Sequence, residues 1–180
     1  ESMIASYTVA TRMENILMIP IIGIQNTMAT FAGQNMGARQ PERVSKGLGQ
    51  GVLVSLLMTA ALCLCQLLGM ELIIRAFKLD AAAAAICRQH LFASVLSEPI
   101  FAIYFPANGM FQGVGEGFHA TFYALMALGL RVVFAYSLYR TAFFGYTAIW
   151  WSQAVAWTLT LVTCYAHFFH GKWKEKSLVS

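Results

Sequence analysis

Residues 51–70 read GVLVSLLMTAALCLCQLLGM and contain no charged side chain. A hydrocarbon core about 30 Å thick is crossed by roughly 20 residues of α-helix, so this stretch is long enough to span a bilayer. Backbone polar groups in hydrocarbon must be hydrogen-bonded within the protein, and the sequence lacks the alternation of a barrel strand. The stretch Gly51–Met70 therefore predicts a transmembrane helix.

Four further apolar stretches follow the same pattern. Hydrophobic residues make up 58% of the 180 residues and charged residues only 11%, about half the charged share of an average soluble domain. The composition predicts an all-α, polytopic transmembrane helix bundle with about five spanning helices. The four further stretches are Met3–Met36, Ala81–Phe111, Phe118–Tyr139 and Phe143–Phe169.

Local signals predict where some helices begin and bend. Pro41 suits the first position of a helix, and Asp80, which precedes the run Ala81–Ala85, suits an N-cap. Pro20 and Pro99 lie inside apolar stretches, where each removes one backbone hydrogen bond. We expect both prolines to bend their helices and consider them hinge candidates; a bend without a hinge role is the alternative.

Basic residues indicate the orientation in the membrane. One group flanks the connection after the first stretch, a second group closes the chain, and five spans place both groups on the same side. The positive-inside rule assigns this side to the cytoplasm. We therefore expect a multi-pass protein of the cell membrane with a cytoplasmic C-terminus, and no nucleic-acid partner. The two groups are Arg39, Arg43 and Lys46, and Lys172, Lys174 and Lys176.

Ionisable groups inside hydrocarbon are functional candidates, because each costs roughly 2.5–3.5 kcal/mol on insertion scales. At 1.5 Å per residue, Glu98 lies about 10 Å and Arg131 about 9 Å below the outer surface. The matching depths predict a Glu98–Arg131 pair, with two unrelated groups as the alternative. A carboxyl group in a poorly hydrated cavity favours its protonated form, so Glu98 suits proton coupling. Sodium would need several further oxygen ligands, for which Ser97 and Asn108 are candidates.

Arg12 and Glu14 are also ionisable, but their depth depends on the end of the helix from which it is counted. Counted back about 20 residues from Met36, they fall near the outer interface. Counted forward from Met3, they fall in the middle of the membrane. We expect them to be solvated, with the buried position as the alternative.

Other polar and aromatic residues suit a substrate cavity rather than catalysis. Tyr104, Asn108 and Trp157 are predicted to line the cavity, where aromatic rings contact flat cations; rings packed between helices or facing lipid are the alternative. No nucleophile–base constellation is visible, so we expect no enzyme and no cofactor besides the coupling ion. His167 and His170 have helical i, i+3 spacing but no acidic or cysteine companion nearby in the sequence, so we predict no metal site.

Several motifs, in order, resemble the multidrug and toxic compound extrusion (MATE) family. Residues 30–47 (TFAGQNMGARQPERVSKG) are similar to its GQNxGA-type motif and the basic loop that follows. Residues 108–117 (NGMFQGVGEG) occupy the place of its glycine-rich turn, although Phe111-Gln112 and Glu116-Gly117 depart from the usual Leu-Arg and Asp-Thr. Further similar runs are ATRMENILMIP, LRVVFAYSL, GYTAIWWSQ and FFHGKWK.

The resemblance implies a twelve-helix fold in two lobes, of which residues 1–180 would form helices eight to twelve. The N-terminal lobe and the first helix of the C-terminal lobe would then be absent. It implies a secondary active antiporter that exports cationic or aromatic compounds, with organic cations as the expected substrates, in exchange for H⁺ or Na⁺ by alternating access. Glu98, the one acid of the tenth helix, would be the ion-coupling residue. The alternatives are a flippase for lipid-linked oligosaccharides and a membrane scaffold that does not transport.

Overall fold

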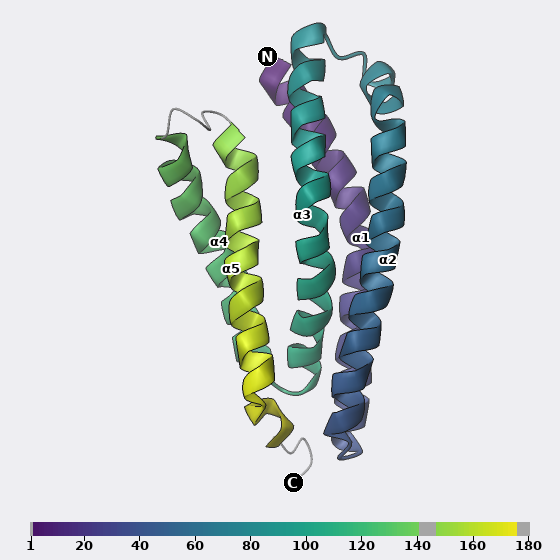
Figure 1. The fold of residues 1–180 in the computed structure, drawn as a ribbon, viewed down its shortest axis with the longest axis vertical. Helices are drawn as coiled ribbons and strands as arrows, with labels where there is room; N and C mark the ends of the chain where they lie inside the picture. The colour runs from purple at the N-terminus through teal and green to yellow at the C-terminus, as the bar shows by residue number, and fades with distance from the viewer. Residues whose placement is uncertain (1, 141–146, 176–180) are drawn as a thin grey trace.

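The computed structural model describes residues 2–140 and 147–175 and consists there of five long α-helices followed by one short 3-10 helix (Figure 1). This confirms the predicted all-α fold. The start of the expected stretch Phe143–Phe169, up to residue 146, lies outside the described residues. The elements are α1 (Ser2–Gly37), α2 (Pro41–Ala76), α3 (Ala81–Gly113), α4 (Gly117–Tyr139), α5 (Ala148–His170) and η2 (Lys172–Glu175).

Four of the helices, α1 to α4, are long and apolar enough to cross a membrane, and α5 has the same length as α4. Their outer surfaces are apolar. On α2, for example, the side chains of Leu57, Leu68 and Leu72 are 64%, 78% and 73% exposed. A contiguous apolar exterior of this kind marks a surface that contacts lipid. The chain is therefore a multi-pass membrane protein.

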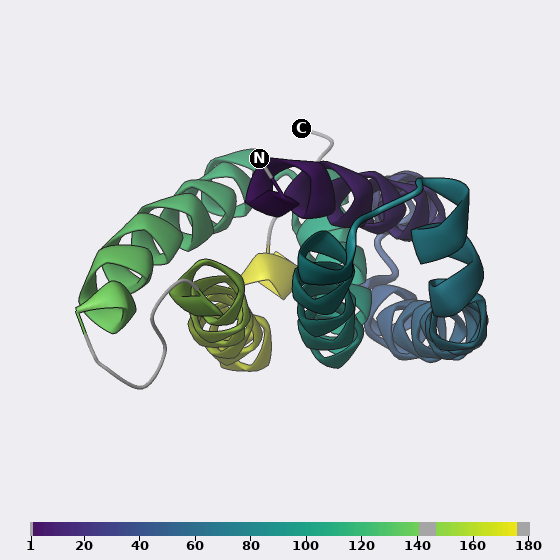
Figure 2. The same ribbon diagram turned by 90° about the horizontal axis from the view of Figure 1, so that it is seen from above.

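The helices form two layers. Figure 2 shows α5, α3 and α2 side by side in one layer, with α4 and α1 in the other. Helix α3 packs against each of the other four long helices, and its contact with α1 is the most extensive. The start of α1 and the short helix η2 lie at opposite ends of the bundle (Figure 1). We call these the N-terminal end and the C-terminal end; the α1–α2 and α3–α4 turns lie at the C-terminal end.

The helix starts follow the local signals in the sequence. Helix α2 begins at Pro41, which confirms the prediction for that residue. Helix α3 is capped by Asp80, whose Oδ1 accepts a hydrogen bond from the backbone N–H of Ala83 at 2.7 Å, so that prediction is also confirmed. Pro20 and Pro99 lie within the uninterrupted helices α1 and α3. A hinge role for them stays a prediction.

Glycines bring α1 and α3 into backbone contact. A Cβ atom added to Gly109 would meet the backbone carbonyl oxygen of Gln25, and one added to Gly113 would meet that of Ala29. Any larger residue would push the two helices apart. Small residues commonly allow this kind of close approach between transmembrane helices. The glycines therefore fix how α1 crosses α3, and with it the side chains that meet between them.

Candidate ion-coupling site

A cavity of about 230 Å³ opens between four helices in the half of the bundle towards the N-terminal end. Its wall combines polar and aromatic side chains, and its charged members are two acids and one arginine. The polar and aromatic lining comprises Tyr7, Thr11, Glu14 and Asn15 of α1, Glu98 and Phe101 of α3, Arg131 of α4, and Gln153 and Trp157 of α5. Charged groups from three helices are thus brought to one interior space.

Glu98 is the most deeply buried acid of this cavity. Its side chain is 1% exposed, and in the described part of the chain Oε2 has no hydrogen-bond partner. Buried polar atoms are rarely left without a partner, because the lost hydration is not replaced. An unpaired carboxyl oxygen on a cavity wall is therefore a position where a proton or a cation can be bound.

Arg131 lines the same cavity as Glu98. The residues described by the structure include no ion pair between these two side chains within 4.0 Å. Arg131 also shares this cavity with Glu14 of α1. A direct role of Arg131 as the partner of Glu98 stays a prediction, and Glu14 joins the same electrostatic cluster.

Glu14 is bonded to side chains of α3, so the expectation that it is merely solvated is wrong. Its side chain is 20% exposed, accepts a hydrogen bond from the Ser94 hydroxyl and lies 3.1 Å from Nε2 of His90. The His90 ring stacks between Tyr7 and Trp150, with centroid separations of 5.5 and 4.9 Å. This arrangement fixes the carboxylate of Glu14 at the edge of the cavity.

The sequence carried a signal for this contact that hydropathy does not detect. His90, Ser94 and Glu98 are spaced four residues apart, so they share one face of α3. A polar stripe on an otherwise apolar helix must face either water or polar groups on another helix. Glu14 on α1 supplies the polar group for the first two members of the stripe.

Tyr104, Asn108 and Trp157 line a second cavity, of about 360 Å³, nearer the C-terminal end. Trp157 also lines the first cavity. The Asn108 Oδ1 atom accepts hydrogen bonds from the side-chain amides of Gln25, at 2.9 Å, and Gln112, at 2.7 Å. Its Nδ2 donates to the Tyr104 hydroxyl and the Ala120 carbonyl, both at 2.9 Å. These four bonds use the full capacity of the amide, so Asn108 ties α1, α3 and α4 together.

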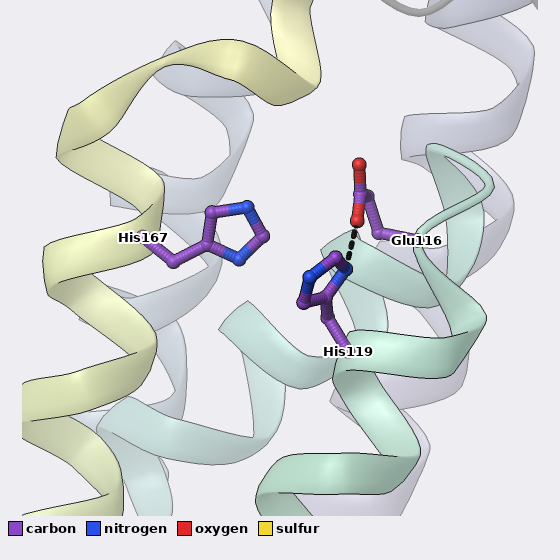
Figure 3. A group of neighbouring side chains, drawn as sticks. All are labelled: Glu116, His119 and His167. Atoms are coloured by element: carbon purple, nitrogen blue, oxygen red, sulfur yellow. Dashed lines mark ion pairs between the residues drawn. The ribbon is translucent and has the colours of Figure 1, made fainter.

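A second group of titratable side chains lies at the C-terminal end. Glu116, His119 and His167 place one possible ligand atom each within 4.8 Å of one another, and Figure 3 shows the three side chains facing a common space. His167 therefore has an acidic companion in space, Glu116, although it has none nearby in the sequence. The sequence separation between Glu116 and His167 concealed a contact that only the packing of α4 on α5 creates.

A bundle of membrane-spanning helices around an interior cavity lined by charged groups defines a polytopic membrane protein with a polar interior. The family model MatE matches residues 1–137. The chain belongs to the MatE family, which confirms the resemblance found in its motifs.

One solved structure has the same fold. It is a MOP superfamily transporter from Pyrococcus furiosus Vc1 (DSM3638), described as having a reversed polarity of the binding pocket that suggests a different function. The match has a TM-score of 0.80 and 15% sequence identity, and covers 96% of this chain and 38% of that transporter. The chain thus spans well under half the length of this structural relative. No curated protein matches the chain.

Proposed function

We propose that this chain forms part of a secondary active antiporter, which exports cationic or aromatic compounds across the cell membrane in exchange for protons by alternating access. Membership in the MatE family supports a transport role. The observation that carries the proposal is the buried Glu98, with one carboxyl oxygen unpaired on the wall of a cavity. Glu98 binds the proton, and a cationic substrate competes with that proton for the same interior charge.

The coupling ion in this proposal is the proton rather than sodium. A sodium ion is held by several oxygen ligands, in the manner of other hard cations. The side-chain oxygen of Asn108 already accepts two hydrogen bonds, and the Ser97 hydroxyl donates to the Ala93 carbonyl at 2.9 Å. Of the two sodium ligands expected from the sequence, Asn108 already has its oxygen saturated and Ser97 is bonded to its own helix, whereas a proton needs only the carboxylate of Glu98.

The charge of the cavity favours cationic substrates. Glu14 and Glu98 line it against the single basic side chain of Arg131. The alternative, a flippase for lipid-linked oligosaccharides of the same superfamily, requires a cavity rich in basic residues to hold its anionic substrate. The cavity here has more acidic than basic side chains, which is the opposite of what such a flippase needs. Export of organic cations is therefore the better supported function.

The proposal also states how the chain is oriented in the membrane and that a second lobe of the transporter packs beside it. Arg39, Arg43, Lys172 and Lys174 belong to the C-terminal end of the bundle, and the positive-inside rule places that end in the cytoplasm. The present helices act as the C-terminal lobe of the transporter. They move against an N-terminal lobe, with the two cavities opening towards the space between the lobes.

The substitution Glu98→Gln tests the coupling role, because it keeps the shape of the side chain and removes the titratable proton. The protein encoded by the complete reading frame that contains this chain is reconstituted in vesicles. The flux of a fluorescent organic cation is then followed under an imposed proton or sodium gradient. We expect a proton gradient to drive transport by the native protein and not by the Glu98→Gln variant. The thermal stability of both proteins is measured to show that folding is intact.

Glu71→Gln is the matched control, since Glu71 lies on the outside of α2 and its half-exposed carboxylate pairs with Arg88. This control should transport at the native rate. Full proton-driven transport by Glu98→Gln would reject the assignment of Glu98. Transport driven only by a sodium gradient, and lost in the same variant, would replace the proton by sodium.

A further inference from the structure

Glu116, His119 and His167 converge from two helices that meet at the C-terminal end of the bundle (Figure 3). Glu116 immediately precedes α4, His119 lies in its first turn, and His167 lies in the last turn of α5. The Glu116 carboxylate forms an ion pair with Nδ1 of His119. The rings of His119 and His167 have their centroids 4.6 Å apart. One carboxylate and two imidazoles thus share a single small volume.

The backbone and the surrounding side chains hold this group in place. The N–H of Glu116 donates to the Phe111 carbonyl at 2.8 Å, and its carbonyl accepts from Ala120 at 3.0 Å. The side chain of Glu116 is only 6% exposed, whereas that of His119 is 44% exposed. The carboxylate is therefore fixed in the interior, while His119 can adjust its position from the solvent side.

His167 is oriented by two neighbours. The Tyr123 hydroxyl lies 2.7 Å from Nδ1, and the ring of Phe111 stacks on the imidazole at a centroid separation of 4.8 Å and an interplanar angle of 12°. Histidines that bind a metal through one ring nitrogen nearly always use the other in a hydrogen bond of this type, which fixes the tautomer and the ring orientation. Tyr123 in that role assigns Nε2 of His167 to the ion.

We propose that Glu116, His119 and His167 bind a divalent transition-metal ion with the coordination chemistry of Zn²⁺. Two imidazoles and one carboxylate suit zinc and its neighbours in the first transition row, whereas calcium and magnesium prefer oxygen ligands alone. Three protein ligands leave a fourth position for water, as in zinc sites that exchange a ligand.

The site needs only a small contraction to accept the ion. Ligands at zinc–ligand distances of about 2.0–2.2 Å in a tetrahedron are about 3.3–3.6 Å apart, and the three present ligand atoms lie within 4.8 Å of one another. Rotation of the half-exposed His119 supplies the required movement. The ion lies between Glu116 and His119, and any proton that these ligands hold is released to solvent on binding.

The bound ion would join the α3–α4 turn to the end of α5. Glu116 and His119 belong to the turn and the start of α4, and His167 belongs to α5, so coordination links segments that are far apart in sequence. The site lies away from the Glu98 cavity and has no lining residue in common with it. It therefore acts as a clamp on this end of the bundle and is independent of the coupling role proposed for Glu98.

The test is Zn²⁺ binding by the purified, untagged and metal-free protein in detergent, measured by competition with a chromogenic chelator. The native protein is expected to bind one Zn²⁺ ion saturably, and bound Co²⁺ is expected to show the visible absorption of a tetrahedral site. His119→Gln and His167→Ala should each lower the affinity at least tenfold. Tyr123→Phe should lower it by about 10-fold, which is less than the loss caused by either ligand substitution.

His170→Ala is the matched control, because His170 lies at the exposed end of the same helix and outside the cluster. It should bind Zn²⁺ with native affinity. Circular dichroism of each variant without metal separates lost binding from lost folding, and the exposed His119 carries the test if His167→Ala does not fold. Absence of saturable binding to the native protein, or an equal loss of affinity in His170→Ala, would overturn the proposal.

Discussion

Replacing Gly109 by alanine measures how strongly the backbone contact between α1 and α3 determines stability. The new Cβ would meet the carbonyl oxygen of Gln25, and the carbonyl carbon and Cα of Gln25 lie 2.9 and 3.1 Å from its position. All three are main-chain atoms of a helix, so they cannot move aside as a flexible side chain can. Overpacking of this kind typically costs about 1–3 kcal/mol.

The substitution also has a favourable component, because alanine exceeds glycine in helix propensity by about 1 kcal/mol. Gly129→Ala on α4 has the same component, and nothing lies within 4 Å of its added Cβ. The difference between the two variants therefore isolates the overpacking. We expect Gly109→Ala to unfold with a free energy about 1–3 kcal/mol below that of Gly129→Ala.

The measurement is reversible unfolding in mixed micelles of a mild and a denaturing detergent, followed by circular dichroism. Both variants are compared at equal protein concentration with the native chain. If their unfolding free energies agree to within about 0.5 kcal/mol, the usual range for neutral surface changes, then α1 and α3 are not held at the separation described here. The interpretation of the glycines as spacers would then be refuted.

Two further predictions concern hydrogen bonds and use the same unfolding measurement. Asp80→Ala removes the N-cap bond to Ala83 and should lower the unfolding free energy by about 1 kcal/mol. Asp80→Asn keeps an acceptor oxygen and should therefore retain most of the stability that the cap provides. Equal losses of unfolding free energy in the two variants would argue against the cap. Asn108→Leu leaves the partners of the Asn108 side-chain amide unpaired. It should lower the free energy of unfolding by about 1–3 kcal/mol. The same change at the exposed Asn26 of α1 should cause no loss, and similar effects at the two positions would contradict a structural role of the Asn108 network.

The helices could be predicted from the sequence because the forces that define them act over short range. Pro41 and Asp80 mark helix starts through their own backbone and side-chain chemistry, and both predictions are confirmed. The stretch Gly51–Met70 was identified correctly but is shorter than α2, which runs from Pro41 to Ala76. Hydropathy finds the part of a helix that suits hydrocarbon, whereas hydrogen bonding continues the helix into its more polar ends.

The candidate sites could be predicted only in part, because they depend on how helices are rotated and crossed. Counting residues along each helix predicts that Glu98 and Arg131 lie at the same depth in the membrane, and both side chains line one cavity. Depth alone does not determine which side chains face each other, so the contact of Glu14 with His90 was missed.

The metal-ligating cluster illustrates the same limitation over a longer separation. Glu116 and His119 are neighbours within one turn, which spacing can reveal, but His167 reaches them only through the pairing of α4 with α5. Nothing in the local sequence of either segment specifies this pairing. It follows from the apolar faces of whole helices, whose relative rotation a single sequence does not determine.

Helix α3 packs against all four other long helices, and this position limits the residues that it can accommodate. An ordinary transmembrane helix at the edge of a bundle tolerates any apolar residue on the side that meets lipid. Helix α3 has such a side only in its first half, where Phe92 and Leu96 are 55% and 51% exposed; from Phe101 to Phe111 its side chains are buried or half-buried by protein. Random substitutions should therefore be tolerated least in this second half of α3, and the acquisition of new transport specificity should proceed mainly through changes in the helices around it.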